Sequence, residues 1–142
     1  MLVPDVNVLV YAHRRESPRH DEYRVWLSEV LAGNEPVGIS ELVLSGFVRV
    51  VTHHRIFDEP TPVATAVAFC EAVLGGPAVV PLRPGPRHWA LFAHLCVDGD
   101  ARGNLASDAY HAALAMEHGA TWVTTDKGFA RFRRLRTATP LE

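Results

Sequence analysis

The sequence predicts an α/β fold, in which a mostly parallel sheet lies between layers of helices. Short apolar segments typical of buried strands alternate with longer segments of helical period, and parallel strands need such long crossover connections. The 142 residues contain no internal repeat, low-complexity tract or linker. We therefore expect a single domain, residues 1–142, with helices on both faces of its sheet.

The first half of the chain predicts two strands and three helices. Strands are expected at residues 2–6 and 37–39. Helices are expected from about Val8 to just before Ser17, from 19 to 31, and from 41 to about 52. Pro4 stands near the end of the first strand because proline has no N–H for the ladder. Ser40 suits the N-cap of the third helix, and Glu41 suits the positive end of its dipole.

The second half predicts three further helices and three further strands. Helices are expected at residues 61–74, 86–97 and 105–118. Strands are expected at residues 78–82, 121–125 and 135–138. The polar segment 98–104 is expected to be a loop. Small residues at Ala109, Ala112 and Ala113 give the last helix a face that can pack closely on a sheet.

The composition is that of an ordinary globular protein and indicates no particular partner. The apolar fraction is 48%, the charged fraction 21% and the net charge −2, so nucleic-acid binding would depend on where the basic groups lie. Cys70 and Cys96 lie in apolar helical segments and are interpreted as free thiols in a reducing compartment. No apolar run approaches the ~20 residues that cross a bilayer, and the N-terminus does not resemble a signal peptide. We expect no membrane partner and a cytoplasmic location.

Four acidic residues fall where the predicted elements meet one edge of the sheet. Asp5 closes the first strand, and Asp126 follows the strand at 121–125. Glu41 comes directly after the strand at 37–39, and Asp108 lies near the start of the alanine-rich helix. Ligand sites of parallel sheets lie at the carboxyl ends of their strands, near a switch point of the topology. The sequence therefore predicts an acidic cluster at this edge.

Each acid by itself also has a purely structural interpretation. Asp5 suits a strand-end cap, and Glu41 suits the first turn of a helix. Asp108 with Ser107 could cap its helix, and Asp126 could belong to a turn. The set of four, rather than any single member, indicates a function.

A divalent cation would relieve the repulsion among clustered carboxylates. Oxygen ligands suit Mg²⁺, with Mn²⁺ as a possible substitute. Such an ion lowers the pKa of a bound water and stabilises the charge that develops on a phosphoryl group, so phosphodiester hydrolysis is the reaction that best uses the site. Asn7 could support a ligating carboxylate, and the Thr124 hydroxyl could orient Asp126 or a metal-bound water. Both roles compete with local turn hydrogen bonds.

Four segments resemble the motifs of PIN-domain nucleases, and most closely those of the VapC ribonuclease toxins. In order, they are LVPDVNVLVYA (2–12), SELVLSGF (40–47), ASDAYHAALA (106–115) and TTDKGF (124–129). The resemblance covers nearly the whole chain and implies an α/β/α fold, Mg²⁺- or Mn²⁺-dependent endoribonuclease activity, a cognate antitoxin and a homodimer. It also implies that Asp5 and Asp108 are the principal metal ligands and that Glu41 and Asp126 complete the cluster.

An acidic pocket needs basic residues around it to hold RNA. The candidates are Arg102, Lys127, Arg131, Arg133, Arg134 and Arg136, which alternatively form a solvated face. Trp89, Trp122 and Phe129 could stack on unpaired bases, although Trp122 is better placed in the core. His111 lies one turn from Asp108, but we assign it no role in substrate binding.

Three other functions remain open from the sequence. An aspartyl-phosphate enzyme would use Asp5 as a covalent nucleophile, but Asn7 stands where its second acid is expected. A housekeeping PIN nuclease would process structured RNA, although the short chain favours a toxin. A non-catalytic PIN-like scaffold would be expected to lack some of the acids, and all four are present.

Overall fold

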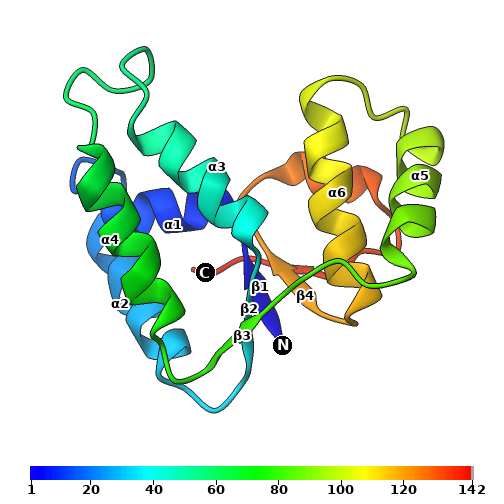
Figure 1. Ribbon diagram of the computed structural model, residues 1–142, viewed down its shortest axis with the longest axis horizontal. Coiled ribbons are helices and arrows are strands. Elements are labelled where there is room, and N and C mark those ends of the chain that lie inside the picture. The colour runs from blue at the N-terminus through cyan, green and yellow to red at the C-terminus, as the bar shows by residue number, and fades with distance from the viewer. Residues whose placement is uncertain (142) are drawn as a thin grey trace.

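A five-stranded, all-parallel sheet forms the centre of the molecule (Figure 1). The computed structural model describes residues 1–141. The strands are β1 (Leu2–Pro4), β2 (Val37–Ile39), β3 (Val79–Pro81), β4 (Thr121–Val123) and β5 (Thr137–Ala138). Their order in the sheet is β3-β2-β1-β4-β5. This arrangement confirms the predicted parallel sheet.

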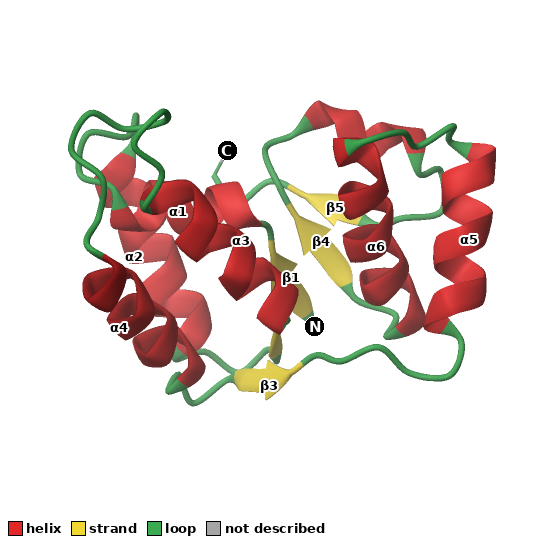
Figure 2. Cartoon of the chain, turned by 45° about the horizontal axis from the view of Figure 1, so that its top comes forward, coloured by secondary structure: helices red, strands yellow, loops and turns green. Residues whose placement is uncertain are grey.

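Helices cover both faces of the sheet, which confirms the three-layer α/β/α architecture (Figures 1 and 2). Within residues 1–141 the α-helices are α1 (Val6–His13), α2 (His20–Leu31), α3 (Glu41–Val51), α4 (Val63–Leu74), α5 (His88–Asp98) and α6 (Asn104–Glu117). Helices α1 to α4 form one layer, and α5 and α6 form the other (Figure 2). A 3₁₀-helix, η1 (Lys127–Arg131), follows β4 and was not predicted from the sequence.

The first strand is shorter than predicted, and the helix after it begins earlier. We expected a strand to Val6 and a helix from about Val8, but β1 ends at Pro4 and α1 begins at Val6. The reason is the N-cap: Asp5 has extended backbone angles, and its side chain accepts a hydrogen bond from the Val6 N–H at 2.6 Å. The backbone therefore turns into a helix directly at the acid.

The remaining predicted boundaries differ from the observed ones by a few residues. Strand β4 stops at Val123, two residues before the expected end, although the N–H of Thr124 still donates to the Ala138 carbonyl at 2.9 Å. Helix α6 begins at Asn104 and ends before Gly119. Gly119 has φ +62°, a left-handed conformation that glycine adopts without strain at a helix C-terminus. Asp108 is therefore a full turn inside α6 rather than at its start.

The alanine face of α6 packs on the sheet as predicted. Ala109, Ala112 and Ala113 are each 0% exposed, and α6 contacts β4. Because alanine side chains are small, the helix backbone can approach the strands closely. This close approach places the N-terminal half of α6, with Asp108, beside the ends of the central strands.

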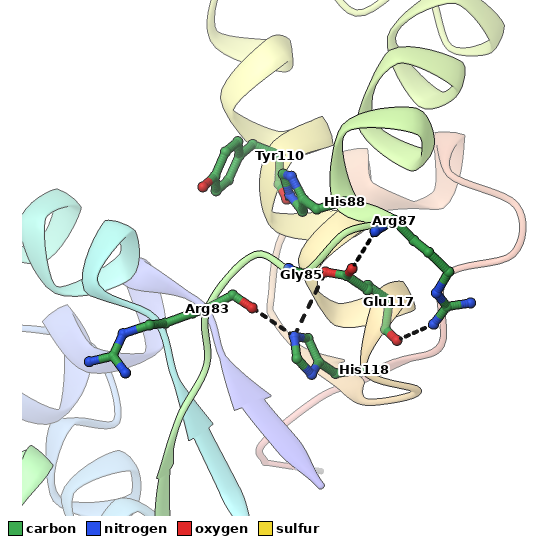
Figure 3. A network of polar contacts seen from close by, with 7 residues as sticks. All are labelled: Arg83, Gly85, Arg87, His88, Tyr110, Glu117 and His118. Atoms are coloured by element: carbon green, nitrogen blue, oxygen red, sulfur yellow. Dashed lines mark hydrogen bonds and ion pairs between the residues drawn. The ribbon is translucent and has the colours of Figure 1, made fainter.

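A polar network fixes the second helical layer (Figure 3). The Glu117 carboxylate, at the end of α6, accepts hydrogen bonds from the backbone N–H groups of Gly85 at 2.8 Å and Arg87 at 2.9 Å. The Arg87 guanidinium donates to the Glu117 carbonyl at 2.7 Å, and the His118 ring lies 2.9 Å from the Arg83 carbonyl. Glu117 thus holds the segment that leads into α5, and this contact joins α5 to the end of α6.

The two cysteines form no disulfide, as the sequence predicted. Cys70 is buried and Cys96 half-buried, and both are free thiols. Across residues 1–141 no helix combines the length and apolarity needed to span a bilayer.

Candidate active site

The topology reverses between β1 and β4, and the candidate site lies there. From β1 the chain proceeds outward to β2 and β3, whereas from β4 it proceeds in the other direction to β5. Strands β1 and β4 are adjacent and parallel, and the Asp5 N–H donates to the Val123 carbonyl at 2.9 Å. Their carboxyl ends therefore meet at a switch point, where α/β sheets bind ligands.

Asp5 is held in place by two hydrogen bonds. Asp5 is buried, with only 7% of its surface exposed. One carboxylate oxygen accepts from the Val6 N–H at 2.6 Å, and the other accepts from the Thr124 hydroxyl at 2.6 Å. A carboxylate has about four acceptor positions, so these two bonds orient Asp5 without exhausting its capacity to bind a cation.

Thr124 connects two of the predicted acids. Besides donating to Asp5, its hydroxyl oxygen accepts a hydrogen bond from the backbone N–H of Asp126 at 3.0 Å. The Asp126 carboxylate accepts from the Gly128 N–H at 2.8 Å and caps η1. Asp126 thus has the turn role considered from the sequence, while it lies next to the residue that holds Asp5. Thr124 orients the Asp5 side chain directly, and it fixes Asp126 through the backbone.

The electrostatics bring Asp108 into the same cluster. Burial, together with the negative charges of Asp126 and Asp5, raises the pKa of Asp108 to about 6. Burial also raises the pKa of Asp5, with a contribution from Asp126, against the lowering effect of its hydrogen bonds from Thr124 and Val6. Three carboxylates from β1, α6 and the β4–η1 turn therefore lie close enough to repel one another.

The capping interpretation of Asp108 is wrong. The N-cap of α6 is Gly103, and the first turn of the helix contains no acidic residue. Asp108 therefore has no capping function that would explain a partly buried carboxylate with a raised pKa. Arg131 acts on it in the opposite sense, because its positive charge lowers the pKa of Asp108.

Glu41 lies at the same edge of the sheet but is less engaged than the other three acids. It is the first residue of α3, directly after Ser40, whose hydroxyl accepts from the Leu42 N–H at 3.1 Å as the predicted cap. Its side chain is exposed. The charge of Asp126 raises the pKa values of Asp5 and Asp108, and the charge of Asp5 raises that of Asp108. Among the described residues, Glu41 has no such effect on either acid.

The donor set suits a hard cation, although the carboxylates are not already gathered around one point. In residues 1–141 no three His, Cys, Asp or Glu side chains are placed closely enough to hold a metal ion. Asp5, Asp108 and Asp126 offer only carboxylate oxygens, which Mg²⁺ and Mn²⁺ prefer over nitrogen or sulfur. Their mutual repulsion is the interaction that such an ion would relieve, so the residues fit the predicted group in chemistry and charge.

The basic residues predicted for RNA binding differ in their contacts and in their effect on the acidic cluster. Arg131 donates to the Gly128 carbonyl at 3.3 Å and to the Gly99 carbonyl at 3.2 Å, and it is the member whose charge acts on Asp108. Arg102 is exposed and pairs with Asp100 at 3.0 Å. Lys127, Arg133 and Arg134 are exposed, as is Asn7 in the first turn of α1.

Two of the aromatic candidates belong to the core instead of the site. Trp122 is 1% exposed and Phe129 2% exposed, so neither ring is available to stack on a base, whereas Trp89 is 73% exposed. His111 is 6% exposed and its ring stacks on Trp122, with centroids 5.2 Å apart. Burial lowers the pKa of His111 to about 4. His111 is therefore a neutral core residue, in agreement with our assigning it no role in substrate binding.

Sequence reasoning missed a cavity of about 630 Å³ beside Asp126. It lies between the end of β4, η1 and β5, and its lining includes Thr125, Thr137 and Thr139. The only signal in the sequence was the recurrence of threonine around the last acid and in the final strand. Nothing local shows that these two segments face each other, because the pairing of β4 with β5 brings them together.

Comparisons with known proteins agree with these features. Residues 2–135 match the family model of the PIN domain. VapC ribonuclease Mb2897 of Mycobacterium bovis is 51% identical over 142 residues, which cover 100% of this chain and 97% of that protein. Ribonuclease VapC25 of Mycobacterium tuberculosis is 44% identical over 140 residues, which cover 99% of both chains. The structure of VapBC2 from Rickettsia felis bound to a promoter DNA fragment has a TM-score of 0.70 and 22% identity, with 97% of each chain covered.

Proposed function

The chain belongs to the PIN-domain family and, within it, to the VapC ribonucleases; on this premise we propose that it hydrolyses RNA phosphodiester bonds with a divalent cation, Mg²⁺ or in its place Mn²⁺. The observation that supports the cation is the convergence of Asp5, Asp108 and Asp126: burial and the charges of the other two acids raise the pKa of Asp108 to about 6. Such mutual repulsion is costly without an opposing charge.

Four carboxylates would hold the cation in this proposal. Asp5 and Asp108 are the principal ligands, and Asp126 and Glu41 complete the set. The bound ion would supply a water of lowered pKa and would stabilise negative charge on the phosphoryl group. Asp5 is already oriented by Thr124 and by the Val6 N–H. Asp108 must lose its proton before it can ligate, so binding should weaken below about pH 6.

Arg131 is the residue best placed to contact a phosphate. Backbone carbonyls of Gly99 and Gly128 hold its guanidinium, and its charge is felt at Asp108. A guanidinium can donate two parallel hydrogen bonds to phosphate oxygens. Lys127, Arg102, Arg133 and Arg134, whose side chains are also exposed, would contribute further contacts with the RNA backbone. Asn7 remains a candidate to support the ligating acids.

Replacement of Asp5 by Asn tests the chemistry. Asn keeps a side-chain oxygen that can cap α1, so the fold should persist while a charged ligand is lost. We expect at least a ~100-fold loss of cleavage of total cellular RNA, with nearly unchanged thermal unfolding. Asp58→Asn, an exposed loop acid, serves as the matched control. Full cleavage by Asp5→Asn, or full activity of the native protein in excess chelator, would refute the cation mechanism.

Membership of this family also supports a proposal about the biological role of the protein. We propose that the protein is the toxin of a toxin–antitoxin pair in the cytoplasm, that a cognate antitoxin binds it, and that it forms a homodimer. The similarity to VapBC2 of Rickettsia felis, a two-component assembly by its name, supports the antitoxin. Expression alone should arrest growth, and co-expression of a small neighbouring gene should relieve the arrest. Unaffected growth would instead favour a housekeeping nuclease or a non-catalytic scaffold.

A further inference from the structure

The cavity beside Asp126 shares two walls with the acidic cluster. Its volume is about 630 Å³, and Thr124 and Asp126 belong to its lining. The Thr124 hydroxyl holds Asp5, while the Thr124 N–H donates to the Ala138 carbonyl of β5 at 2.9 Å. The same residue therefore fixes both the principal acid and the opposite side of the cavity. A ligand in the cavity would lie next to any phosphate bound at the acids.

The lining combines hydroxyl groups, one cation and apolar surface. Thr125, Thr137 and Thr139 are exposed and present hydroxyls that can both donate and accept hydrogen bonds. Lys127 provides the positive charge, and the apolar surface includes Phe129 and the small Ala130. This volume lies within the range of small-ligand pockets, and this mixture of groups matches a nucleoside with an attached phosphate.

We propose that this cavity is a subsite for the unpaired nucleotide that flanks the scissile phosphate of RNA. The proposal rests on the ribonuclease function proposed above and adds to it the place where this nucleotide is bound. The base enters beside Ala130, the threonine hydroxyls bind its polar edge or the ribose, and Lys127 contacts the next phosphate. A base that is stacked and paired in a duplex cannot enter such a cavity, whereas the bases of loops and free ends can turn out of the strand.

Two variants test the subsite in different ways. Thr125→Val with Thr139→Val removes two hydroxyls at nearly constant volume, and Ala130→Trp fills the cavity. Both changes are at exposed positions, so the fold should tolerate them. Thr65→Val, an exposed threonine on α4, is the matched control. The measurements are KM and kcat on a short single-stranded RNA, the distribution of cleavage sites, and the rise in Tm with Mn²⁺.

We expect the double valine variant to raise KM by about ten-fold, since each lost hydrogen bond typically weakens binding by roughly two- to ten-fold. Ala130→Trp should raise KM at least as much. Cleavage sites should be redistributed, the Mn²⁺ shift should match the native protein, and Thr65→Val should behave as the native protein does. The native preference for single-stranded RNA over a fully paired duplex should narrow in both variants.

Unchanged KM and cleavage sites in both variants, with an active native protein, would overturn the subsite and leave the ribonuclease function intact. A lost Mn²⁺ shift in the double valine variant would also overturn it, because the threonines would then act through the acids. If the native protein cleaves no RNA with Mg²⁺ or Mn²⁺, the proposed function fails separately. Binding of a labelled single-stranded RNA would then be measured by fluorescence anisotropy, with Asp5→Asn alone and with Asp5→Asn combined with each cavity variant. The subsite predicts weaker binding by the combined variants, and equal binding would overturn it.

Discussion

Asp108 and His111 lie one turn apart on α6, and burial shifts their pKa values in opposite directions. The pKa of Asp108 rises to about 6 from 3.8, whereas that of His111 falls to about 4 from 6.5. Both shifts favour the neutral form, which is the form that survives away from water. They have opposite consequences for stability, because the native state binds the proton of Asp108 more tightly than the unfolded chain does and that of His111 less tightly.

Asp108→Asn should stabilise the cation-free protein at pH 8. The raised pKa means that the stabilising contribution of Asp108 is complete below about pH 4 and is lost as the pH rises through about 6. After allowance for solvent screening, removal of the charge should gain roughly 1 kcal/mol, or about 3 °C in Tm. The advantage over the native protein should shrink toward zero at pH 4. An equal gain from Asp58→Asn would show that general charge, not the cluster, is responsible.

His111→Phe should remove an acid sensitivity of the fold. Since the unfolded chain binds the proton more tightly, the native protein should lose on the order of 2–3 kcal/mol from this residue as the pH falls from 6.5 to 4. Phe preserves the stacking on Trp122 and eliminates the ring Nδ1, which has no hydrogen-bond partner within the described residues. Denaturant unfolding at pH 7 and pH 4.5 measures the difference. The same pH dependence in both proteins would contradict the burial argument; exposed His94→Gln is the control.

The junction of β4 with η1 shows how the ends of elements build the site. Strand β4 stops at Val123, and Thr124 follows it: its N–H still donates to Ala138 of β5, while its hydroxyl donates to Asp5. Asp126 then caps η1, and Asp5 caps α1. For Asp5 and Asp126, the capping residue and the candidate ligand are therefore the same. The turn interpretation of Asp126 is confirmed, whereas Asp5, interpreted as a strand-end cap, is the N-cap of α1.

Thr124→Val should impair the site without removing an acid. The Thr124 hydroxyl lowers the pKa of Asp5, so its loss should raise that pKa further and move the acidic limb of the cleavage pH profile upward. Loss of a group that orients a ligand typically costs about ten-fold or more in activity, and the loss should be greater at pH 6 than at pH 8. Thr121→Val, at the other end of β4, is the control. A uniform loss at every pH would indicate a structural effect alone.

On the scale of the whole molecule, the topology assembles a site from residues far apart in the chain. Asp5 and Asp108 come from opposite layers, because α1 starts at the end of β1 in one layer and α6 lies in the other (Figures 1 and 2). The hydrogen bonds that Glu117 accepts from the segment before α5 keep the second layer together (Figure 3). A cation held between the two layers should therefore stabilise the fold as a whole.

Addition of Mg²⁺ or Mn²⁺ should raise Tm at pH 8. Binding to the native state alone adds about 2.7 kcal/mol at a cation concentration of 100 times Kd. The increase should be much smaller at pH 5, since protonation of Asp108, with its pKa of about 6, competes with the cation. Asp108→Asn should abolish the increase at both pH values, and Asp58→Asn should preserve it. An identical increase at pH 5 and pH 8 would argue against Asp108 as a ligand.

The sequence by itself determined the class of fold, because the alternation of apolar strands with helical segments depends on local periodicity. It also predicted which acids form the candidate site, since motifs such as SELVLSGF and TTDKGF are contiguous. It could not determine where β1 ends, because the change from strand to helix at Asp5 depends on hydrogen bonds to Val6 and Thr124, and Thr124 is distant in sequence.

Only the tertiary structure decided how each residue is used. Strand pairing of β4 with β5 forms the cavity, and packing places Phe129 and Trp122 in the core. The position of Arg131 near Asp108 distinguishes it from the other basic residues, because its charge lowers the pKa of that acid. The cavity, the charge effect on Asp108 and the packing of the core each depend on residues that are distant in sequence and close in space. Desolvation and Coulomb interactions depend on three-dimensional distance, and the sequence fixes only the order of the residues along the chain.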